Sequence, residues 1–349
     1  MKKSLLALAA LTAFAGAASA QSSVTMYGRV DLSVGRNIGS DAKFMANGSG
    51  SRLGMRGSED LGGGMSAIFN IEHRFDADTG ASQNFNVCGL RPNGSQSNNT
   101  TTTVVGGAGG TVSVAGACNN NRFWGARSFV GLQGGFGSVV LGREYTTSFL
   151  GNQLIADPWG WDTVANQAGI TGLGGIAKVR NDSSLTYKVA FGGFGLGAQV
   201  AEATDAINQF DSKPYNFSLG YNAGPVSIGA GYEHTGRATL GGDDEDMWGV
   251  NAAFKFGAFK PGLFYGEGNA LSGAKHKGAM ATVTMALGSG ELRASYGRLK
   301  AGNTTVSKRA ALGYHYSMSK RTTLYADVAH EGEAASNKAG FDLGIKHNF

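Results

Sequence analysis

Alternation with a period of two residues is the feature that most limits what this chain can fold into. In many segments between Val24 and Phe349, apolar side chains return at every second position, and polar, charged or glycine residues fill the positions between them. A β-strand points successive side chains to opposite faces, so each segment would have one apolar face and one polar face. We count sixteen such segments. The cleanest stripe consists of Trp248, Val250, Ala252, Phe254 and Phe256.

The composition supports strands and turns rather than membrane helices or a nucleic-acid binder. No stretch after residue 20 approaches the roughly 18 consecutive apolar residues that a helical span requires. The chain has 57 glycines, and 16% of its residues are charged, against about a quarter in soluble domains. The formal net charge of +5 is too small to indicate nucleic acid, which we do not expect as a partner.

The first twenty residues are typical of a secretory signal peptide. Lys2 and Lys3 precede an apolar run from Leu5 to Ala18, which ends in a small-residue cleavage site at positions 18–20. The alternative is a membrane anchor, for which the apolar run is short. We therefore expect residues 1–20 to be removed and residues 21–349 to form a single domain.

The lengths of the connections between the predicted strands also alternate. Short glycine turns such as 62–64 follow one end of the strands, while long connections such as 76–121, 144–177 and 300–307 follow the other. This is the layout of an outer-membrane barrel, which has short periplasmic turns and long extracellular loops. The prediction is an all-β fold, a 16-stranded antiparallel transmembrane β-barrel.

Two arguments favour a barrel over a pair of packed aqueous sheets. A sheet in lipid must close because each unpaired backbone group costs several kcal/mol, and sixteen strands enclose a lumen wide enough for water. Two eight-stranded sandwiches would show the same alternation but would bury the apolar stripes face to face. Tyrosine and tryptophan at strand ends, such as Trp248, Tyr265 and Tyr296, suit the interfacial girdles of a membrane barrel.

The connection at 144–177 breaks the alternation and carries Gly, Asn, Thr, Trp and acidic residues. A connection of this length inside a compact domain is functional, or the element assignment is wrong. We interpret it as a loop that folds inside the barrel and narrows a water-filled pore. Trp159 and Trp161 would then pack this loop against the wall, with a platform for sugars as the alternative.

Several motifs together resemble the general porins of Gram-negative outer membranes, most closely the β-proteobacterial and neisserial type. These motifs are MYGRVDLSVG, SRLGMRGSEDLGGGMSAIFNIE, SFVGLQGGFGSVVLGREY, SKRTTLYAD and the terminal GIKHNF. The resemblance covers the chain from Ser23 to Phe349. It implies a homotrimer in the outer membrane, surrounded by outer-membrane lipids and lipopolysaccharide, with the third long loop folded into each pore. It also implies that the barrel-insertion machinery recognises Phe349 as an assembly signal.

The side chains that would set the field in the pore are charged residues at lumen-facing positions and on the loop. By parity and by resemblance to the basic ladder of enteric porins, Arg29, Arg52, Arg143 and Arg180 are the basic candidates. Arg56, Arg74 and Arg127 are weaker additions. The acidic candidates opposite them are Asp157, Asp162 and Glu144, of which Asp157 is preferred. Each arginine has a simpler alternative role as a lumen residue paired with an acid, and the two aspartates have one in turn formation.

The long connection at 76–121 departs from the compact family form and contains both cysteines of the chain, Cys88 and Cys118. An even pair in an exported chain predicts one disulfide, with two free thiols as the alternative. We expect this loop at the outer surface, where in related porins the second loop often contacts a neighbouring subunit.

The function predicted from these features is passive diffusion of small hydrophilic solutes and ions, with moderate anion selectivity. The alternatives are a channel specific for a sugar or an anion, and a surface adhesin or structural barrel. No Ser/His/Asp grouping and no metal-ligand spacing stands out among the six histidines. We therefore expect neither an enzyme nor a metal or other cofactor.

Overall fold

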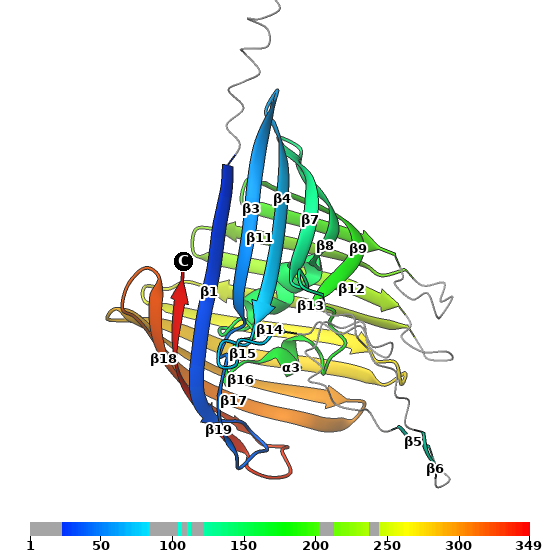
Figure 1. Cartoon of the computed structure of the whole chain (residues 1–349). Helices are drawn as coiled ribbons and strands as arrows, with labels where there is room; N and C mark the ends of the chain where they lie inside the picture. The colour runs from blue at the N-terminus through cyan, green and yellow to red at the C-terminus, as the bar shows by residue number, and fades with distance from the viewer. Residues whose placement is uncertain (1–22, 84–103, 107–109, 113–121, 203–212, 237–243) are drawn as a thin grey trace, which may run out of the picture.

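The computed structural model describes residues 23–83, 104–106, 110–112, 122–202, 213–236 and 244–349. Antiparallel strands form one large sheet in these residues, and a small pair, β5 and β6, lies apart from it (Figure 1). The strands are β1 (Ser23–Arg36), β2 (Lys43–Ala46), β3 (Ser51–Gly62), β4 (Met65–Phe75), β5 (Val104–Gly106), β6 (Gly110–Val112), β7 (Arg127–Gly134), β8 (Gly137–Tyr145), β9 (Arg180–Phe191), β10 (Phe194–Ala201), β11 (Tyr215–Ala223), β12 (Val226–Gly236), β13 (Glu245–Phe254), β14 (Phe259–Asn269), β15 (Lys275–Leu287), β16 (Gly290–Ala301), β17 (Thr304–Ser317), β18 (Thr322–Glu331) and β19 (Ala339–Asn348).

The large sheet closes into a ring of sixteen positions, although the described residues form seventeen strands in it. Both β2 and β3 pair with β1, at successive heights, and together they occupy one position. On its other edge β1 pairs with β19, from Arg29 opposite Asn348 to Arg36 opposite Phe341. This pairing closes the sheet, so the prediction of a 16-stranded antiparallel barrel is confirmed and the sandwich alternative is wrong.

The apolar stripes of the alternation lie on the outside of the barrel. On β14, Leu263 is 65% exposed while its neighbour Phe264, which points inward, is 3% exposed. Tyr27 has the inward parity, and its hydroxyl donates a hydrogen bond to Asn70 Oδ1 at 2.9 Å, so it is a lumen residue rather than part of a girdle. Among the described residues, no helix has the length and apolarity to cross a membrane.

The two ends of the barrel have different connections. In the described residues, seven short turns join strand pairs at one end, with left-handed glycines such as Gly192, Gly224 and Gly288 (φ 55–58°) where an L side chain would be strained. The connections at the other end are longer, with one exception. Residues 300–307, expected to form a long loop, extend the hairpin instead, since Lys300 pairs with Thr305 and Ala301 with Thr304.

The last residue of the chain extends the pairing between β1 and β19, where the barrel closes. The amide of Phe349 donates to the carbonyl of Gly28 at 3.1 Å, and the amide of Gly28 donates back to Phe349 at 3.0 Å. A Cβ atom on Gly28 would lie 2.3 Å from the Phe349 ring, so only glycine leaves room for the ring here. The role of Phe349 as an assembly signal stays a prediction. Residues 1–20 and both Cys88 and Cys118 lie outside the described residues.

Candidate channel constriction

The connection between β8 and β9 folds into the barrel, and it turns inward directly after β8. The amide of Thr146 donates to Val179 O at 3.0 Å and its hydroxyl to Lys178 O at 2.8 Å, which pins the two ends of the loop together. Asn216 on β11 accepts hydrogen bonds from the amide and the hydroxyl of Thr147 at 2.7 and 2.8 Å. These bonds turn the loop inward, where it forms the short helices η1 (Phe149–Gln153), α2 (Leu154–Ala156) and α3 (Ala168–Thr171).

Apolar contacts hold the loop against one side of the lumen. Ile170 and Leu173, both fully buried, pack with inward-facing residues of β13 to β16. Two glycines on that wall make space: a Cβ on Gly297 would lie 2.4 Å from Ile170, and one on Gly278 would lie 2.8 Å from Leu173. Burial of an Ile or Leu side chain is worth about 1.5–3 kcal/mol, so this contact is a strong anchor. The wall residues are Met247, Phe264, Met280 and Leu299.

A second contact anchors the tip of the loop. Trp159 is buried, and its indole Nε1–H donates to Asp327 Oδ1 on β18 at 2.7 Å. The imidazole of His315 lies 3.1 Å from the same carboxylate oxygen. Trp161 stays within the loop, where its Nε1–H donates to Thr171 at 2.8 Å. Trp159 thus packs the loop against the wall, as interpreted from the sequence, whereas Trp161 bonds within the loop and also lines the cavity described below.

Asp157 shapes the loop tip rather than the cavity that we expected it to face. Its carboxylate accepts hydrogen bonds from the amides of Trp159 and Trp161 at 3.0 Å each and from that of Gln167 at 2.8 Å. The residue is 3% exposed, and burial raises the pKa of its carboxyl to about 6 in spite of these bonds. Its acceptor sites are occupied by the loop backbone, which is the physical reason for its placement.

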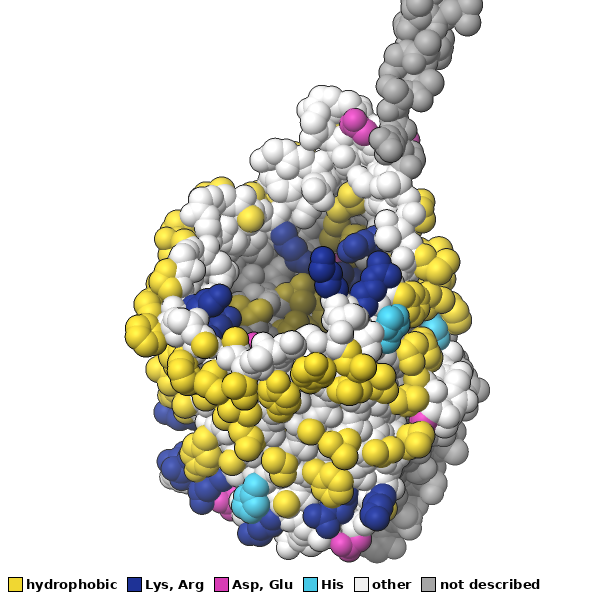
Figure 2. All heavy atoms as spheres, turned by 90° about the vertical axis from the view of Figure 1, so that its left-hand side faces the viewer, with side chains coloured by type: hydrophobic (Ala, Val, Ile, Leu, Met, Phe, Trp, Pro, Cys, Tyr) yellow, Lys and Arg dark blue, Asp and Glu magenta, His cyan; other side chains and the backbone are white. Residues whose placement is uncertain are grey.

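A cavity of about 1000 Å³ remains between the loop and the opposite wall. Phe149, Trp161 and Asp162 line it from the loop, and Tyr145 and Glu72 line it from the wall. Figure 2, looking into the barrel, shows Lys and Arg side chains gathered on one inner wall and apolar side chains around the outside. The arginines that line the cavity come from five strands, β1, β3, β4, β7 and β9, and are Arg29, Arg52, Arg74, Arg127 and Arg180.

Carboxylates partly balance these arginines but lie deeper in the wall. Glu72 lies 3.7 Å from Arg52 and 3.6 Å from Arg74, and its side chain is only 4% exposed. Glu144, 3% exposed, lies 3.1 Å from Arg127. The arginines of these pairs are 16–26% exposed. Within these pairs, the charge nearest the water is therefore that of the guanidinium group.

Asp162 is the acid that the loop presents to the cavity. Its Oδ2 lies 3.5 Å from Arg29 Nη1, and its side chain is 29% exposed. Burial raises the pKa of Asp162, while Arg29 and Arg52 act in the opposite direction. Tyr145 links two further arginines, since its hydroxyl accepts hydrogen bonds from Arg74 at 2.7 Å and from Arg180.

The predicted site residues thus divide into two groups. Arg29, Arg52, Arg180 and Asp162 line one cavity, whereas Arg143, Glu144 and Asp157 do not line it. Arg143 pairs with Asp182 at 2.5 Å, and Glu144 lies beneath Arg127.

Sequence reasoning missed two wall residues and undervalued two others. Glu72 and Tyr145 were not proposed, although Glu72 has the same inward parity as Arg74. Arg74 and Arg127, the weaker candidates from the sequence, also line the cavity. Within the described residues, no group of three or more His, Cys, Asp or Glu side chains is placed to hold a metal ion.

Comparisons with known proteins agree with this geometry. A family profile described as Gram-negative porin matches residues 7–335. Outer membrane porin protein 32 of Delftia acidovorans is 28% identical over 403 aligned residues, which cover all of both chains. Major outer membrane protein P.IB of Neisseria meningitidis serogroup B is 28% identical over 250 residues, 67% of this chain and 60% of that protein.

Solved structures give the same architecture. An anion-selective porin from Comamonas acidovorans superposes with a TM-score of 0.72 at 25% identity, covering 94% of this chain and all of that one. A trimer form of OmpT from Vibrio cholerae has a TM-score of 0.65 at 14% identity, covering 94% of this chain and 99% of that one, and so shows the fold alone.

Proposed function

The chain belongs to the Gram-negative porin family and forms an outer-membrane channel for passive diffusion, and from this premise we propose that the channel prefers anions. The observation that carries the proposal is the depth difference between opposite charges at the constriction. The guanidinium groups of Arg52, Arg74 and Arg127 are 16–26% exposed, while the carboxylates of Glu72, which also lines the cavity, and Glu144 are 3–4% exposed.

A narrow aqueous gap in a low-dielectric wall strengthens the effect of such a charge layer. Field lines concentrate in the gap, so ions of the opposite sign are enriched there. Carboxylates that are buried under arginines reduce the field without repelling a passing anion at contact distance. The preference should be moderate, because the lining also includes Asp76, Asp78 and Asp162. The similar porin from Comamonas acidovorans is described as anion-selective, which supports the proposal.

The roles of the individual side chains follow from their positions. Arg29 and Arg52 would contact passing anions, and Arg180, which is 4% exposed, would add positive charge from a buried position. Asp162 would limit the positive field from the loop side. Arg143 and Glu144 would act indirectly, by holding Asp182 and Arg127 in place. Asp157 would act by holding the loop tip.

Reversal potentials test the selectivity. Purified protein in planar bilayers under a tenfold KCl gradient should give a potential of the sign that chloride flux produces. The permeability ratio of chloride to potassium should exceed one. It should approach one at high salt, because the Debye length falls to roughly 3 Å at 1 M and the field of the arginines is screened. A reversal potential at low salt with the sign that potassium flux produces would refute the proposal.

Solute size provides the second readout, because a channel specific for one solute is the alternative. Liposomes that contain the protein should swell at rates that fall smoothly as the solute grows. Saturation of the swelling rate by one sugar or anion would instead favour a specific binding site.

We also propose that the chain works as a homotrimer, that residues 1–20 are removed on export, and that residues 21–349 form the single barrel domain. Related porin structures include a trimer form, which supports the first point. The intact mass of protein purified from membranes should correspond to a chain that starts at Gln21. The same mass, before and after reduction, should reveal whether Cys88 and Cys118 form a disulfide.

A further inference from the structure

A recess of about 510 Å³ lies inside the barrel beneath the loop between β8 and β9, toward the end with the short turns. Thr147 and Leu150 of the loop form its roof, and β7 to β11 form its floor. The floor is hollow because two glycines meet in it. Gly195 of β10 pairs with Gly220 of β11, and a Cβ atom on Gly195 would have no atom within 4 Å. The strands therefore leave space that a bound molecule can fill.

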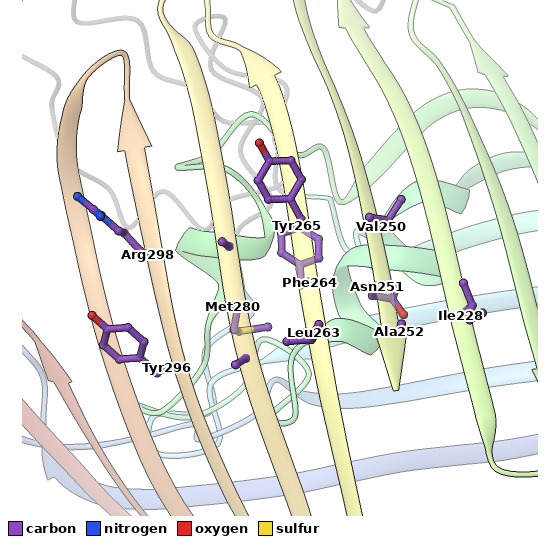
Figure 3. Close-up of a pocket in the computed structure, with 12 residues that line it drawn as sticks. Ile228, Val250, Asn251, Ala252, Leu263, Phe264, Tyr265, Met280, Tyr296 and Arg298 are labelled. Carbon is purple, nitrogen blue, oxygen red and sulfur yellow. The ribbon is translucent and has the colours of Figure 1, made fainter. Parts of the chain in front are cut away.

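The roof of the recess is held on both sides. On one side Asn216 of β11 accepts hydrogen bonds from Thr147 at 2.7 and 2.8 Å. Gly197 of β10 leaves room for this contact, because a Cβ atom there would lie 2.7 Å from the Cβ of Thr147. On the other side Asn251 of β13, labelled in Figure 3, donates to Asn152 Oδ1 at 2.7 Å. The loop is therefore fixed above the recess and does not fill it.

Lys188 of β9 is the cation of the recess, and its charge is weakly compensated. The register places Lys188 opposite Gly197, beside the glycine floor, and its side chain is 35% exposed. It pairs with Glu144, whose carboxylate is 4.0 Å away. That carboxylate is only 3% exposed and lies closer to Arg127, at 3.1 Å. An anion in the recess would therefore meet an accessible ammonium group while the carboxylate stays buried.

The loop also gives the recess an apolar side. Leu150 of η1 lines both the recess and the cavity at the constriction. Leu154 and Trp161 continue this apolar surface along the constriction cavity, which the arginines line from the wall. The loop therefore borders the passage from the basic wall to Lys188. An anion with an apolar body can keep contact with the loop while its charged group moves from one basic region to the other.

We propose that the recess binds monovalent organic anions that have an apolar body. The carboxylate or sulfonate pairs with Lys188, and the apolar body lies over the glycine floor against Leu150. Charge-assisted hydrogen bonds to an ammonium group and the burial of apolar surface together favour such a ligand over chloride. The inference rests on the proposed anion preference, which brings anions into the lumen. The recess lies beside the passage, so uncharged hydrophilic solutes still pass according to their size.

Block of the chloride current by two sulfonates tests this site. Benzenesulfonate and methanesulfonate carry the same permanent charge, but only benzenesulfonate has a large apolar body. Each is added to both sides of a planar bilayer that contains the protein. The concentration for a half-maximal reduction of conductance should be roughly tenfold lower for benzenesulfonate, because the ring loses contact with water in the recess.

Two substitutions separate the charge of the recess from its space. Lys188→Gln should raise the half-maximal concentration of benzenesulfonate roughly tenfold, as the loss of a charge-assisted contact implies, whereas Lys188→Arg should keep the wild-type value. Gly195→Phe fills the floor with every cation in place and should remove the difference between the two sulfonates.

Matched controls exist for both substitutions. Lys260→Gln removes an exposed cation of β14 that has the same inward parity as Phe264. Gly135→Phe adds a ring at a turn where, as at Gly195, a Cβ atom has no neighbour within 4 Å. Neither Lys260 nor Gly135 lines the recess, so both controls should respond to benzenesulfonate like wild type.

Three outcomes would overturn the proposal. These are equal half-maximal concentrations of the two sulfonates in wild type, an unchanged value in Lys188→Gln, and a change as large in Lys260→Gln as in Lys188→Gln. An unchanged value in Lys188→Gln would place the block at the arginines of the constriction.

Reversal potentials in KCl without sulfonate, measured in the same bilayers, separate this result from the proposed anion preference. A preference for potassium together with a block that depends on Lys188 would refute the anion preference alone. A preference for chloride together with a block that does not depend on Lys188 would refute the organic-anion site alone.

Discussion

The two inner walls of this barrel share a strand geometry but differ in what faces them. The wall formed by β1, β3, β4 and β7 to β9 carries the five arginines that line the cavity, and it borders water. The wall formed by β13 to β16 carries Met247, Phe264, Met280 and Leu299 and is covered by the loop. Inward-pointing side chains carry charge where the lumen stays open, whereas under the loop they are apolar or, like Asn251 and Ser295, hydrogen-bonded to it. An unpaired charge could not remain there.

This difference teaches that the loop is part of the core of the molecule. Its apolar contacts form a dry cluster inside a protein whose outer surface faces lipid. The dry wall positions the loop, and the position of the loop sets the width of the gap at the basic wall. Substitutions on the two walls should therefore change different properties, pore size for one and ion preference for the other.

The largest effect is expected from Ile170→Asp, which places a carboxylate in the dry cluster. Burial of a polar group without a hydrogen-bond partner costs roughly 2–7 kcal/mol, more than one apolar anchor contributes, so the loop should leave the wall. Single-channel conductance and the size limit in liposome swelling should both rise. Ile155→Asp is the matched control, since Ile155 belongs to the same loop but is 53% exposed. Equal conductance in the two variants would contradict the division between the walls.

A smaller effect is expected from Trp159→Phe at the loop tip. The variant keeps an aromatic ring but loses the hydrogen bond to Asp327, worth about 1.5–3 kcal/mol for a charged acceptor. Spontaneous closures and current noise should increase while mean conductance changes little. Trp161→Phe removes a bond within the loop, to Thr171, and should leave the noise as in wild type. Identical noise in the two variants would mean that the tip contact does not fix the loop.

The sequence predicted the barrel well because alternation and closure leave few alternatives. Arg29, Arg52 and Arg180 line the cavity on the face that their parity assigns to the lumen. Parity does not tell which lumen residues meet water. Met247 and Met280 are apolar residues with inward parity, and they mark the place where the loop packs. That signal was present in the sequence but could be recognised only once a covering segment was known.

The acidic side of the constriction was harder to predict for a different reason. Asp157 and Asp162 are five residues apart on one loop, and no periodic rule orients loop side chains. Their roles depend on backbone turns at Gly160, Trp161 and Thr163, all with φ between 63° and 64°. These left-handed residues let the backbone amides reach Asp157 and leave Asp162 beside Arg29. Such a local fold follows from tertiary contacts that the sequence alone does not reveal.

On the basic wall, Arg52→Gln should reduce the anion preference without widening the pore. A unit charge about 4 Å from a passing ion is worth roughly 1 kcal/mol in water, which corresponds to a change of about fivefold in permeability ratio. Arg74 still faces Glu72 in this variant, so the carboxylate keeps a partner. Arg293→Gln is the control, because Arg293 pairs with Glu291 at 2.8 Å and does not line the cavity. A fall in selectivity as large in the control as in Arg52→Gln would assign the preference to overall charge.

The smallest effect concerns Asp162, the acid that the loop presents to the basic wall. Burial raises its pKa, so as pH falls below neutral it takes up a proton earlier than an ordinary aspartate and no longer opposes Arg29. Asp157 does not counteract this change, because its carboxyl lies outside the cavity. Burial raises the pKa of Asp157 to about 6, so this carboxyl also takes up a proton as the pH falls. The anion preference should therefore increase between pH 7.5 and pH 5.

Reversal potentials of Asp162→Asn can isolate this carboxylate. The variant should show, already at pH 7.5, the stronger anion preference that wild type reaches at pH 5, and its selectivity should change little with pH. If the preference of Asp162→Asn rises with acidity as much as that of wild type, another group titrates in the pore. If the anion preference of wild type does not change with pH, then the charge of Asp162 does not affect ion passage at the constriction. The arginines of the basic wall alone would then decide which ions pass.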